Sequence, residues 1–164
     1  MSPLLPTWPQ PSHPHLLKVT KSPTAYASGA VSLVALPPGA HFTHITTATA
    51  TDRRTYSTVQ TSRDAHVELN CDLLYCNHSC APSLEFDMAR FEVRVARHRP
   101  LAVGDHLTFF YPSTEWEMAQ PFRCTCGAPG GSCKGWIAGA ARMDAASLRE
   151  YWLNDHIVAR LAEK

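Results

Sequence analysis

The sequence predicts a mainly β fold of short strands that ends in a helical extension. Apolar residues alternate with other residues in the segment 84–95, which is the period of a strand with one buried face. The threonine-rich segment 43–51 has a high β-propensity, because branched side chains fit a pleated surface. From residue 140 to residue 161 the chain is instead rich in helix formers. Strands are therefore expected in the body of the chain and helices at its C-terminal end.

The chain begins with a proline-rich lead, residues 1–14, which contains five prolines and no apolar period. Because proline lacks the backbone donor that helices and strands need, we expect this lead to be extended or disordered. Short strands are then expected at residues 16–20, within 25–36 where a small-residue turn leads into a strand, within 43–51 and at 56–60, with a turn at 37–40.

Further strands are expected in the second half of the body. Between residues 64 and 75 the apolar residues fit neither period, and a strand that leads into a short helical turn is expected there. The two alternating runs of the segment 84–95 predict an antiparallel hairpin around residues 87–90. A turn at 100–104 and a strand at 107–111 complete the β-rich body.

Size and charge limit the classes of function. The 164 residues are enough for one domain with its own core and a small appendage. The formal net charge of +1 provides no global basic field, so direct binding to nucleic acid is not expected. No apolar run reaches the length of a membrane span, and residues 1–9 lack the basic start and apolar core of a signal peptide. These features predict an intracellular protein, in the nucleus or the cytoplasm, with no membrane partner.

Three of the six cysteines, Cys124, Cys126 and Cys133, lie in one glycine-rich segment. An intracellular cysteine is more often a ligand or a reactive group than half of a disulfide, and four thiolates in a tetrahedron suit a structural zinc ion. Three inert thiols are the less favoured alternative, because such a loop could hardly be ordered without the metal. The segment therefore predicts three zinc ligands and requires a fourth from elsewhere.

Cys80 is the candidate for the fourth ligand because it lies in an unusual polar stretch. Residues 77–83, NHSCAPS, offer an amide, an imidazole, a hydroxyl and a thiol at consecutive positions. Cys71 and Cys76 are rivals on the sequence alone, although cysteine is commonly a small buried hydrophobe. We expect this stretch, the segment 104–111 (GDHLTFFY) and the cysteine loop to meet in space and form one site.

Together, these motifs resemble those of SET-domain protein methyltransferases with a post-SET zinc segment. NHSCAPS at 77–83 resembles the asparagine-histidine-serine-cysteine-x-proline motif of that family, and GDHLTFFY at 104–111 resembles its second core motif. The clustered cysteines resemble the post-SET triplet, and Trp116 follows the second motif as in many members. Residues 28–39 resemble, more weakly, the glycine-containing first motif of the family. The resemblance covers residues 15–137.

The resemblance implies a fold and a division of the chain. The fold would be a SET-domain fold of short strands with a pseudoknot-like crossing of the two core motifs, a small zinc-bound post-SET loop and a C-terminal helical extension. The divisions would be the proline-rich lead at 1–14, the SET domain at 15–112, the post-SET zinc segment at 120–137 and the helical extension at 140–164.

The resemblance also implies S-adenosylmethionine as the methyl donor, on one side of the crossing, and a target lysine that enters a narrow channel from the other side. Tyr111 would be the active-site tyrosine beside the transferring methyl group. Phe109 would gate the number of methyl groups that the lysine receives. The donor-binding residues carried over by position are Gly29, Ala30, Val31, Asn77, His78, Tyr111 and Phe122, and the zinc ligands are Cys80, Cys124, Cys126 and Cys133.

The implied chemistry needs no acid–base dyad. A lysine amine has an unperturbed pKa of about 10.4 and must lose its proton before it attacks a methyl group. Desolvation in an aromatic channel lowers that pKa. Alignment of the amine, the methyl group and the sulfur would then be the main catalytic contribution.

The implied partner is a protein substrate with a target lysine, by default a histone tail, otherwise a non-histone protein. A small-molecule acceptor is an alternative, as is a catalytically silent SET fold that serves as a zinc-stabilised interaction module. The silent fold is favoured by Ala27, which stands where the family has its first glycine. Phe110 also stands where the family usually has an acidic residue. A basic strip is interpreted as a solvated strand face and consists of Arg90, Arg94, Arg97, His98 and Arg99.

Overall fold

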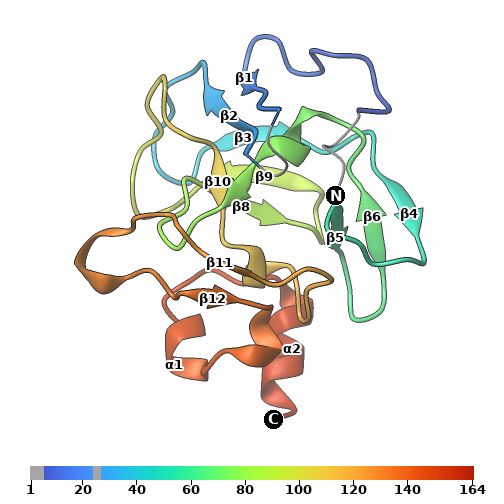
Figure 1. Ribbon diagram of the computed structural model, residues 1–164, viewed down its shortest axis with the longest axis vertical. Helices are drawn as coiled ribbons and strands as arrows, with labels where there is room; N and C mark the ends of the chain where they lie inside the picture. Colours follow the sequence, from blue (N-terminus) through green and yellow to red (C-terminus); the bar gives the residue numbers. More distant parts are fainter. Residues whose placement is uncertain (1–5, 24–26) are drawn as a thin grey trace.

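The computed structural model describes residues 6–23 and 27–164, and strands of two to four residues make up most of the regular structure there (Figure 1). The strands are β1 (Leu17–Thr20), β2 (Gly29–Ser32), β3 (His41–His44), β4 (Thr49–Thr51), β5 (Thr58–Gln60), β6 (His66–Glu68), β7 (Asn77–His78), β8 (Leu84–Asp87), β9 (Glu92–Val95), β10 (Thr108–Phe109), β11 (Phe122–Arg123) and β12 (Trp136–Ile137). The helices are the 3-10 turns η1 (Asp72–Tyr75), η2 (Tyr111–Ser113), η3 (Pro129–Gly131) and η4 (Ala140–Arg142), and the α-helices α1 (Ala145–Leu148) and α2 (Asp155–Ala162).

The strands form two three-stranded antiparallel sheets and three two-stranded pairs. The sheets have the orders β3-β9-β8 and β4-β6-β5, the pairs β1-β2 and β11-β12 are antiparallel, and β7 pairs with β10 in parallel. Figure 1 shows β11 and β12 between the sheets and the C-terminal helices. A mainly β fold of short strands with C-terminal helices is confirmed, and this architecture is consistent with a SET-like fold.

Most expected elements are present, with two local differences. The strand expected at 107–111 pairs only at Thr108–Phe109, and Tyr111 begins η2. Pro112 lacks a backbone N–H, which explains why the strand does not continue. The C-terminal extension is divided into α1 and α2 by an irregular segment at 149–154. The turn expected at Ala25 and Tyr26 lies outside the described residues.

The described part of the proline-rich lead is held against the body. Trp8 Nε1 and Gln10 Nε2 each donate to Asp72 Oδ1 at 2.7 Å, and the Ser12 N–H donates to Asp72 Oδ2 at 2.9 Å. Of the two expected states, extended or disordered, disorder is wrong for residues 6–14, because the buried Asp72 carboxylate receives three donors from them. Residues 1–5 lie outside the described part.

The β8–β9 hairpin forms the centre of the core. Leu84 and Phe86 of β8 and Val93 and Val95 of β9 are each at most 1% exposed. Burial of such side chains stabilises the fold by about 1.5–3 kcal/mol each. The hairpin thus provides a rigid base for the loops around it.

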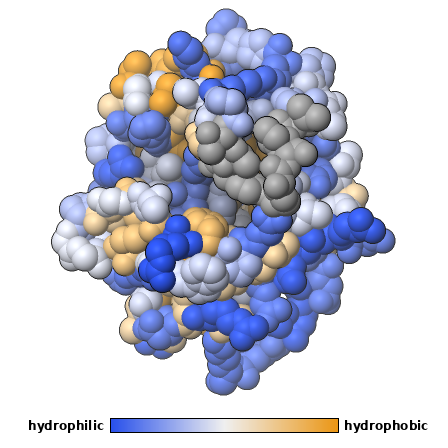
Figure 2. Space-filling model, viewed as in Figure 1, coloured by the Kyte–Doolittle hydropathy of each residue, from blue (hydrophilic) through white to orange (hydrophobic). Residues whose placement is uncertain are grey.

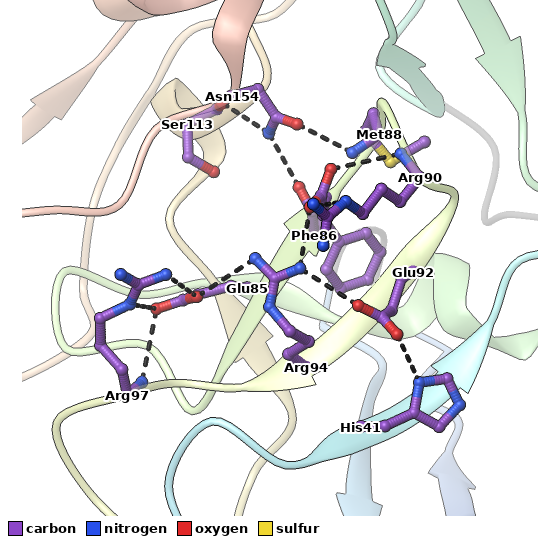
Figure 3. Close-up of polar contacts among 11 residues, drawn as sticks. His41, Glu85, Phe86, Met88, Arg90, Glu92, Arg94, Arg97, Ser113 and Asn154 are labelled. Carbon is purple, nitrogen blue, oxygen red and sulfur yellow. Dashed lines mark hydrogen bonds and ion pairs between the residues drawn. The ribbon is translucent and has the colours of Figure 1, made fainter.

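Arg94 lies on the other face of this hairpin among three carboxylates. Its Nη1 is 2.8 Å from Asp87 Oδ2 and 3.2 Å from Glu92 Oε1, and its Nη2 is 3.7 Å from Glu85 Oε1 (Figure 3). The guanidinium also lies 5.0 Å from the centre of the Trp152 ring. The interpretation of the basic strip as a solvated face is wrong for Arg94, because its charge is paired within the chain and its side chain is only 16% exposed.

Asn154 fastens the C-terminal extension to the body. Its Nδ2 donates to the carbonyls of Phe86 and Ser113, both at 2.8 Å, and its Oδ1 accepts from the Met88 N–H at 2.8 Å (Figure 3). Asn154 is 1% exposed, so these bonds replace water that the buried groups have lost. The extension is therefore part of the folded body.

The surface is mixed in hydropathy. Figure 2 shows hydrophilic residues over the lower part of this face, where α2 lies, and apolar residues gathered at the upper left. Single exposed apolar side chains, such as Leu33 and Val103, are normal on protein surfaces and carry no assignment by themselves. Among the described residues, no helix is long and apolar enough to cross a membrane.

Replacement of Asn154 tests the role of this clamp. Asn154→Ala should lower the free energy of unfolding by about 2–4 kcal/mol, because the Met88 N–H and the Phe86 carbonyl lose their buried partner. Urea unfolding of the two proteins measures the difference. Val158→Ala, at an exposed position of α2, is the control and should change stability by less than about 0.5 kcal/mol. Equal effects of the two substitutions would contradict the clamp.

Candidate functional site

The parallel pair β7–β10 brings the two polar motifs together. Asn77 lies opposite Thr108 and His78 lies opposite Phe109, and the Ser79 N–H donates to the Phe109 carbonyl at 3.1 Å. The two strands are more than 30 residues apart in the chain, so their meeting is a property of the fold. The expectation that these segments meet in space is confirmed.

His78 connects the second motif with the cysteine cluster. The Tyr111 N–H donates to His78 Nδ1 at 3.1 Å, and His78 Nε2 lies 3.4 Å from Cys80 Sγ. Because Nδ1 is the acceptor, the neutral ring carries its proton on Nε2 and donates it to the sulfur. Burial lowers the pKa of His78 to about 4, which keeps the ring neutral at physiological pH.

Tyr111 lies in an aromatic setting next to this histidine. Its ring centre is 4.7 Å from that of Phe109, 5.4 Å from that of His78 and 6.1 Å from that of Phe122. Its hydroxyl donates to the Cys76 carbonyl at 3.0 Å. Burial raises the pKa of the Tyr111 phenol, so the group stays protonated and acts as a hydrogen-bond donor.

Phe109 is a buried core residue. Its ring stacks on Phe86 of the central hairpin with centroids 4.1 Å apart. The ring is 6% exposed and also contacts Tyr111. The central hairpin therefore fixes the position of Phe109 beside Tyr111.

Gly29 and Asn77 form a cradle at the start of β2. Asn77 Nδ2 donates to the Ser28 carbonyl at 2.9 Å, and a Cβ added at Gly29 would lie 3.1 Å from that Nδ2. A larger residue at position 29 would push the amide away. Ala30 is buried behind Gly29, and Val31 forms an isolated bridge with His106. A bare backbone beside an exposed amide fits a small polar ligand such as S-adenosylmethionine.

The four predicted cysteines gather in one place. Cys80, Cys124, Cys126 and Cys133 each offer a sulfur, and these atoms all lie within 4.8 Å of one another. Cys80 Sγ and Cys124 Sγ are 3.8 Å apart, and a tetrahedral zinc with Zn–S bonds of about 2.3 Å places its sulfurs roughly 3.8 Å apart. The donor set therefore fits a structural zinc ion.

Position in the fold distinguishes this cluster from the other thiols. The Lys134 N–H donates to Cys80 Sγ at 3.2 Å and the Cys126 N–H to Cys124 Sγ at 3.4 Å, as expected for sulfurs that carry negative charge. The rivals Cys71 and Cys76 lie instead in the main apolar core. There they pack as small buried hydrophobes.

Tyr151 lies between α1 and α2 and contacts the site. Its ring stacks on Phe110 with centroids 3.6 Å apart, and its hydroxyl donates to the Cys80 carbonyl at 2.7 Å. The Lys134 ammonium lies 5.8 Å from the centre of the Tyr151 ring. The extension therefore supports the loop that carries Cys80. Helical periodicity has no signal for this contact.

Glu115 is a buried acid that the sequence reading did not single out. Its Oε2 accepts from the Gln60 N–H at 2.9 Å and from the Thr114 hydroxyl at 2.7 Å. Burial raises the pKa of Glu115 to about 7. The pKa of Tyr111 is raised mainly by burial of its phenol, and the charges of Cys76 and then Glu115 add to this rise. The only signal in the sequence was its position four residues after the tyrosine.

Two cavities lie apart from this cluster. One, of about 410 Å³, is lined by residues of the lead and β1 such as Pro14 and Val19. The other, of about 360 Å³, is lined mostly by polar residues such as Arg54, Asp64 and His66. Neither is lined by Asn77, His78 or Tyr111, so we do not place the methyl donor in them.

Comparison with known proteins gives the family. The chain is 58% identical over all its 164 residues to a protein named Methyltransferase flvH from Aspergillus flavus, and it covers 91% of that relative. The chain belongs to this methyltransferase family. The present chain is also 35% identical over 86 residues, or 49% of its own length, to an Eremothecium gossypii protein named histone-lysine N-methyltransferase, H3 lysine-36 specific. That match covers 12% of the Eremothecium protein. No protein-family model matches the chain.

The metal site of the methyltransferase is tested by removing one ligand. The wild type should contain about one zinc per chain, and Cys133→Ser should lower both the zinc content and the melting temperature, because one sulfur of the cluster is lost. Elemental analysis of purified protein measures the zinc. Cys71→Ala is the control, because Cys71 lies in the core outside the cluster. Equal zinc in the wild type and Cys133→Ser would remove Cys133 from the ligand set.

Glu115 predicts a pH dependence of stability. The pKa of its carboxyl is raised from 4.5 to about 7 in the folded state, so the folded chain keeps a proton that the unfolded chain has lost in this interval. The contribution of this carboxyl to the free energy of unfolding is fully present below about pH 4.5 and is lost as the pH rises through about 7.

Glu115→Gln removes this titration but keeps an oxygen acceptor. As the pH rises from about 5 to about 8, the free energy of unfolding of the wild type should fall by about 1–3 kcal/mol relative to that of Glu115→Gln. Chemical unfolding at the two pH values measures this difference. A constant difference between the variant and the wild type would show that Glu115 does not titrate in this range.

Proposed function

We propose that this methyltransferase is an S-adenosylmethionine-dependent protein-lysine N-methyltransferase of the SET type. The single observation that carries the proposal is the meeting of Asn77 and His78 with Phe109 and Tyr111, at the β7–β10 pair and the start of η2, directly beside a four-cysteine cluster. The 35% identity with a histone-lysine methyltransferase over about half of the chain supports the lysine specificity. The divisions expected from the sequence, the SET domain at 15–112 and the post-SET segment at 120–137, belong to the same proposal.

The cradle around Gly29 and Asn77 would hold the methyl donor. The backbone of Gly29, Ala30 and Val31 would lie along it, and the absence of a Cβ at Gly29 leaves room for the Asn77 amide that would contact the donor. Phe122, whose ring lies 5.7 Å from that of His78, would close this side. When bound, S-adenosylmethionine supplies a methyl group on a positively charged sulfur.

Tyr111 and Phe109 would shape the place where the lysine amine meets that methyl group. Their aromatic rings exclude water, and desolvation lowers the pKa of an incoming lysine so that it binds as the free amine. Aromatic faces favour the cationic donor and the cationic product by about 0.5–2 kcal/mol per contact. The main contribution to the rate would be orientation, which the stacking of Phe109 on Phe86 and the Tyr111–Cys76 hydrogen bond provide.

The zinc ion would have a structural role. All four positions of a tetrahedral site are filled by Cys80, Cys124, Cys126 and Cys133, which leaves none for a substrate. The ion would hold the segment that carries Phe122 against His78. Loss of zinc would therefore reduce activity through the position of Phe122.

The acceptor is proposed to be a lysine in a protein, with a histone tail as the first candidate because of the Eremothecium relative. The relative that matches the whole chain is named only as a methyltransferase. A non-histone protein or a small amine is accordingly the second candidate.

Methyl transfer from labelled S-adenosylmethionine to core histones and to a whole-cell protein extract tests the proposal. The wild type should label one discrete protein, and Tyr111→Phe should reduce the rate by about a hundredfold, because the reacting groups lose a positioning contact. Tyr56→Phe, at an exposed tyrosine between β4 and β5, is the matched control and should retain activity.

The negative outcomes separate the alternatives. A folded, zinc-loaded protein that labels no protein but binds S-adenosylmethionine in a titration would point to a small-molecule acceptor. Absence of donor binding would overturn the enzymatic proposal and favour a zinc-stabilised interaction module. Full activity of Tyr111→Phe would remove the assigned role of the phenol.

A further inference from the structure

A second group of metal-ligating side chains lies outside the cysteine cluster. His41 and His44 belong to β3 and Glu92 belongs to the neighbouring strand β9. Each offers one ligand atom, and these atoms all lie within 4.8 Å of one another. The methyl-transfer chemistry uses none of the three residues.

A β-bulge explains why the two histidines share a face. In a regular strand, residues three apart point to opposite faces. Here His41 pairs with Arg94 and Thr43 pairs with Val93, so β3 advances two residues while β9 advances one. The extra residue on β3 restores both histidines to the same side. Bulges are often found where a side chain is redirected for a function.

The three side chains are close and accessible. His41 Nδ1 is 2.7 Å from Glu92 Oε2, and the ring centres of His41 and His44 are 4.4 Å apart. Figure 3 shows His41 and Glu92 pointing toward one another across the two strands. The His41 side chain is 47% exposed, so an ion has a direct path from solvent.

Arg94 orients the Glu92 carboxylate but does not neutralise it alone, because two further carboxylates share the Arg94 charge. Its Nη1 contacts Glu92 Oε1 at 3.2 Å, which leaves Oε2 directed at His41. A metal-binding carboxylate is usually held by such a second contact. The positive charge of Arg94 would repel a cation, but Asp87 and Glu85 also pair with it.

We propose that His41, His44 and Glu92 form a surface site for a divalent transition-metal ion, with Zn²⁺ as the physiological candidate. Two imidazoles and one carboxylate are a ligand set for zinc and its neighbours, with water in the remaining position. Ligands at about 2.0–2.2 Å from zinc lie roughly 3.3 Å apart. Small rotations of the exposed histidines produce this spacing. The bound ion would cross-link β3 to β9 and stabilise the central sheet.

A titration with Ni²⁺ tests this site, because imidazole is a preferred ligand of nickel. The sample is the full chain without a polyhistidine tag, with its cysteine cluster loaded with zinc beforehand. Calorimetry should show one Ni²⁺ per chain for the wild type. His44→Gln should weaken the affinity by about tenfold or more. His98→Gln, at an exposed histidine outside the cluster, should leave it unchanged.

Thermal unfolding provides a second readout. Ni²⁺ should raise the melting temperature of the wild type and of His98→Gln, because an ion that binds only the folded state stabilises it. The increase should be absent or much smaller in His44→Gln. The proposal is overturned if the wild type binds no Ni²⁺, or if His44→Gln matches the wild type in both affinity and melting temperature.

Discussion

The proposed site depends on two contacts of the His78 imidazole. One ring nitrogen accepts from the backbone of Tyr111 and the other faces the sulfur of Cys80. Only a neutral ring with its proton on Nε2 makes both contacts, and burial enforces that state by lowering the pKa of the ring. A single buried side chain thus sets the relative positions of the aromatic residues and the cysteine cluster.

The C-terminal extension supports this arrangement from the opposite side. Phe110 stands where the SET-domain motif that the sequence resembles usually has an acid, and its ring stacks on Tyr151. A carboxylate at position 110 would leave this aromatic partner without a stacking surface. The same Tyr151 holds the Cys80 carbonyl, and Asn154 three residues later holds β8 and η2. The phenylalanine at position 110 therefore provides the surface on which the C-terminal extension packs.

Local patterns predicted the parts of the structure that local physics determines. The alternation in 84–95 predicted the central hairpin, and the spacing of Cys124, Cys126 and Cys133 predicted their clustering. Composition did not decide whether the lead is ordered, because proline content carries no information about the Asp72 carboxylate, 60 residues away, that accepts its hydrogen bonds. Tyr151 and Glu115 were missed for the same reason, since their roles depend on the folded surroundings.

The choice between rival cysteines shows the same limit. On the sequence, Cys71, Cys76 and Cys80 were comparable thiols within ten residues. In the fold, η1 directs the first two into the apolar core, and Cys80 faces the glycine-rich loop. The resemblance to a family resolved this choice where periodicity did not. The bulge in β3 likewise has no signature in the sequence.

The contacts that complete the fold join residues that are far apart in the chain. Trp8 meets Asp72 across 64 residues, Met88 meets Asn154 across 66, and Cys80 meets Tyr151 across 71. A chain with such high contact order must close long loops before it gains these interactions, which slows folding. Because Tyr151 and Asn154 follow Cys80 and Met88 in the chain, the ribosome synthesises them later. The loop that carries Cys80 therefore lacks its lateral support until Tyr151 has left the ribosome, so this part of the site can form only after the segment 80–151 is complete.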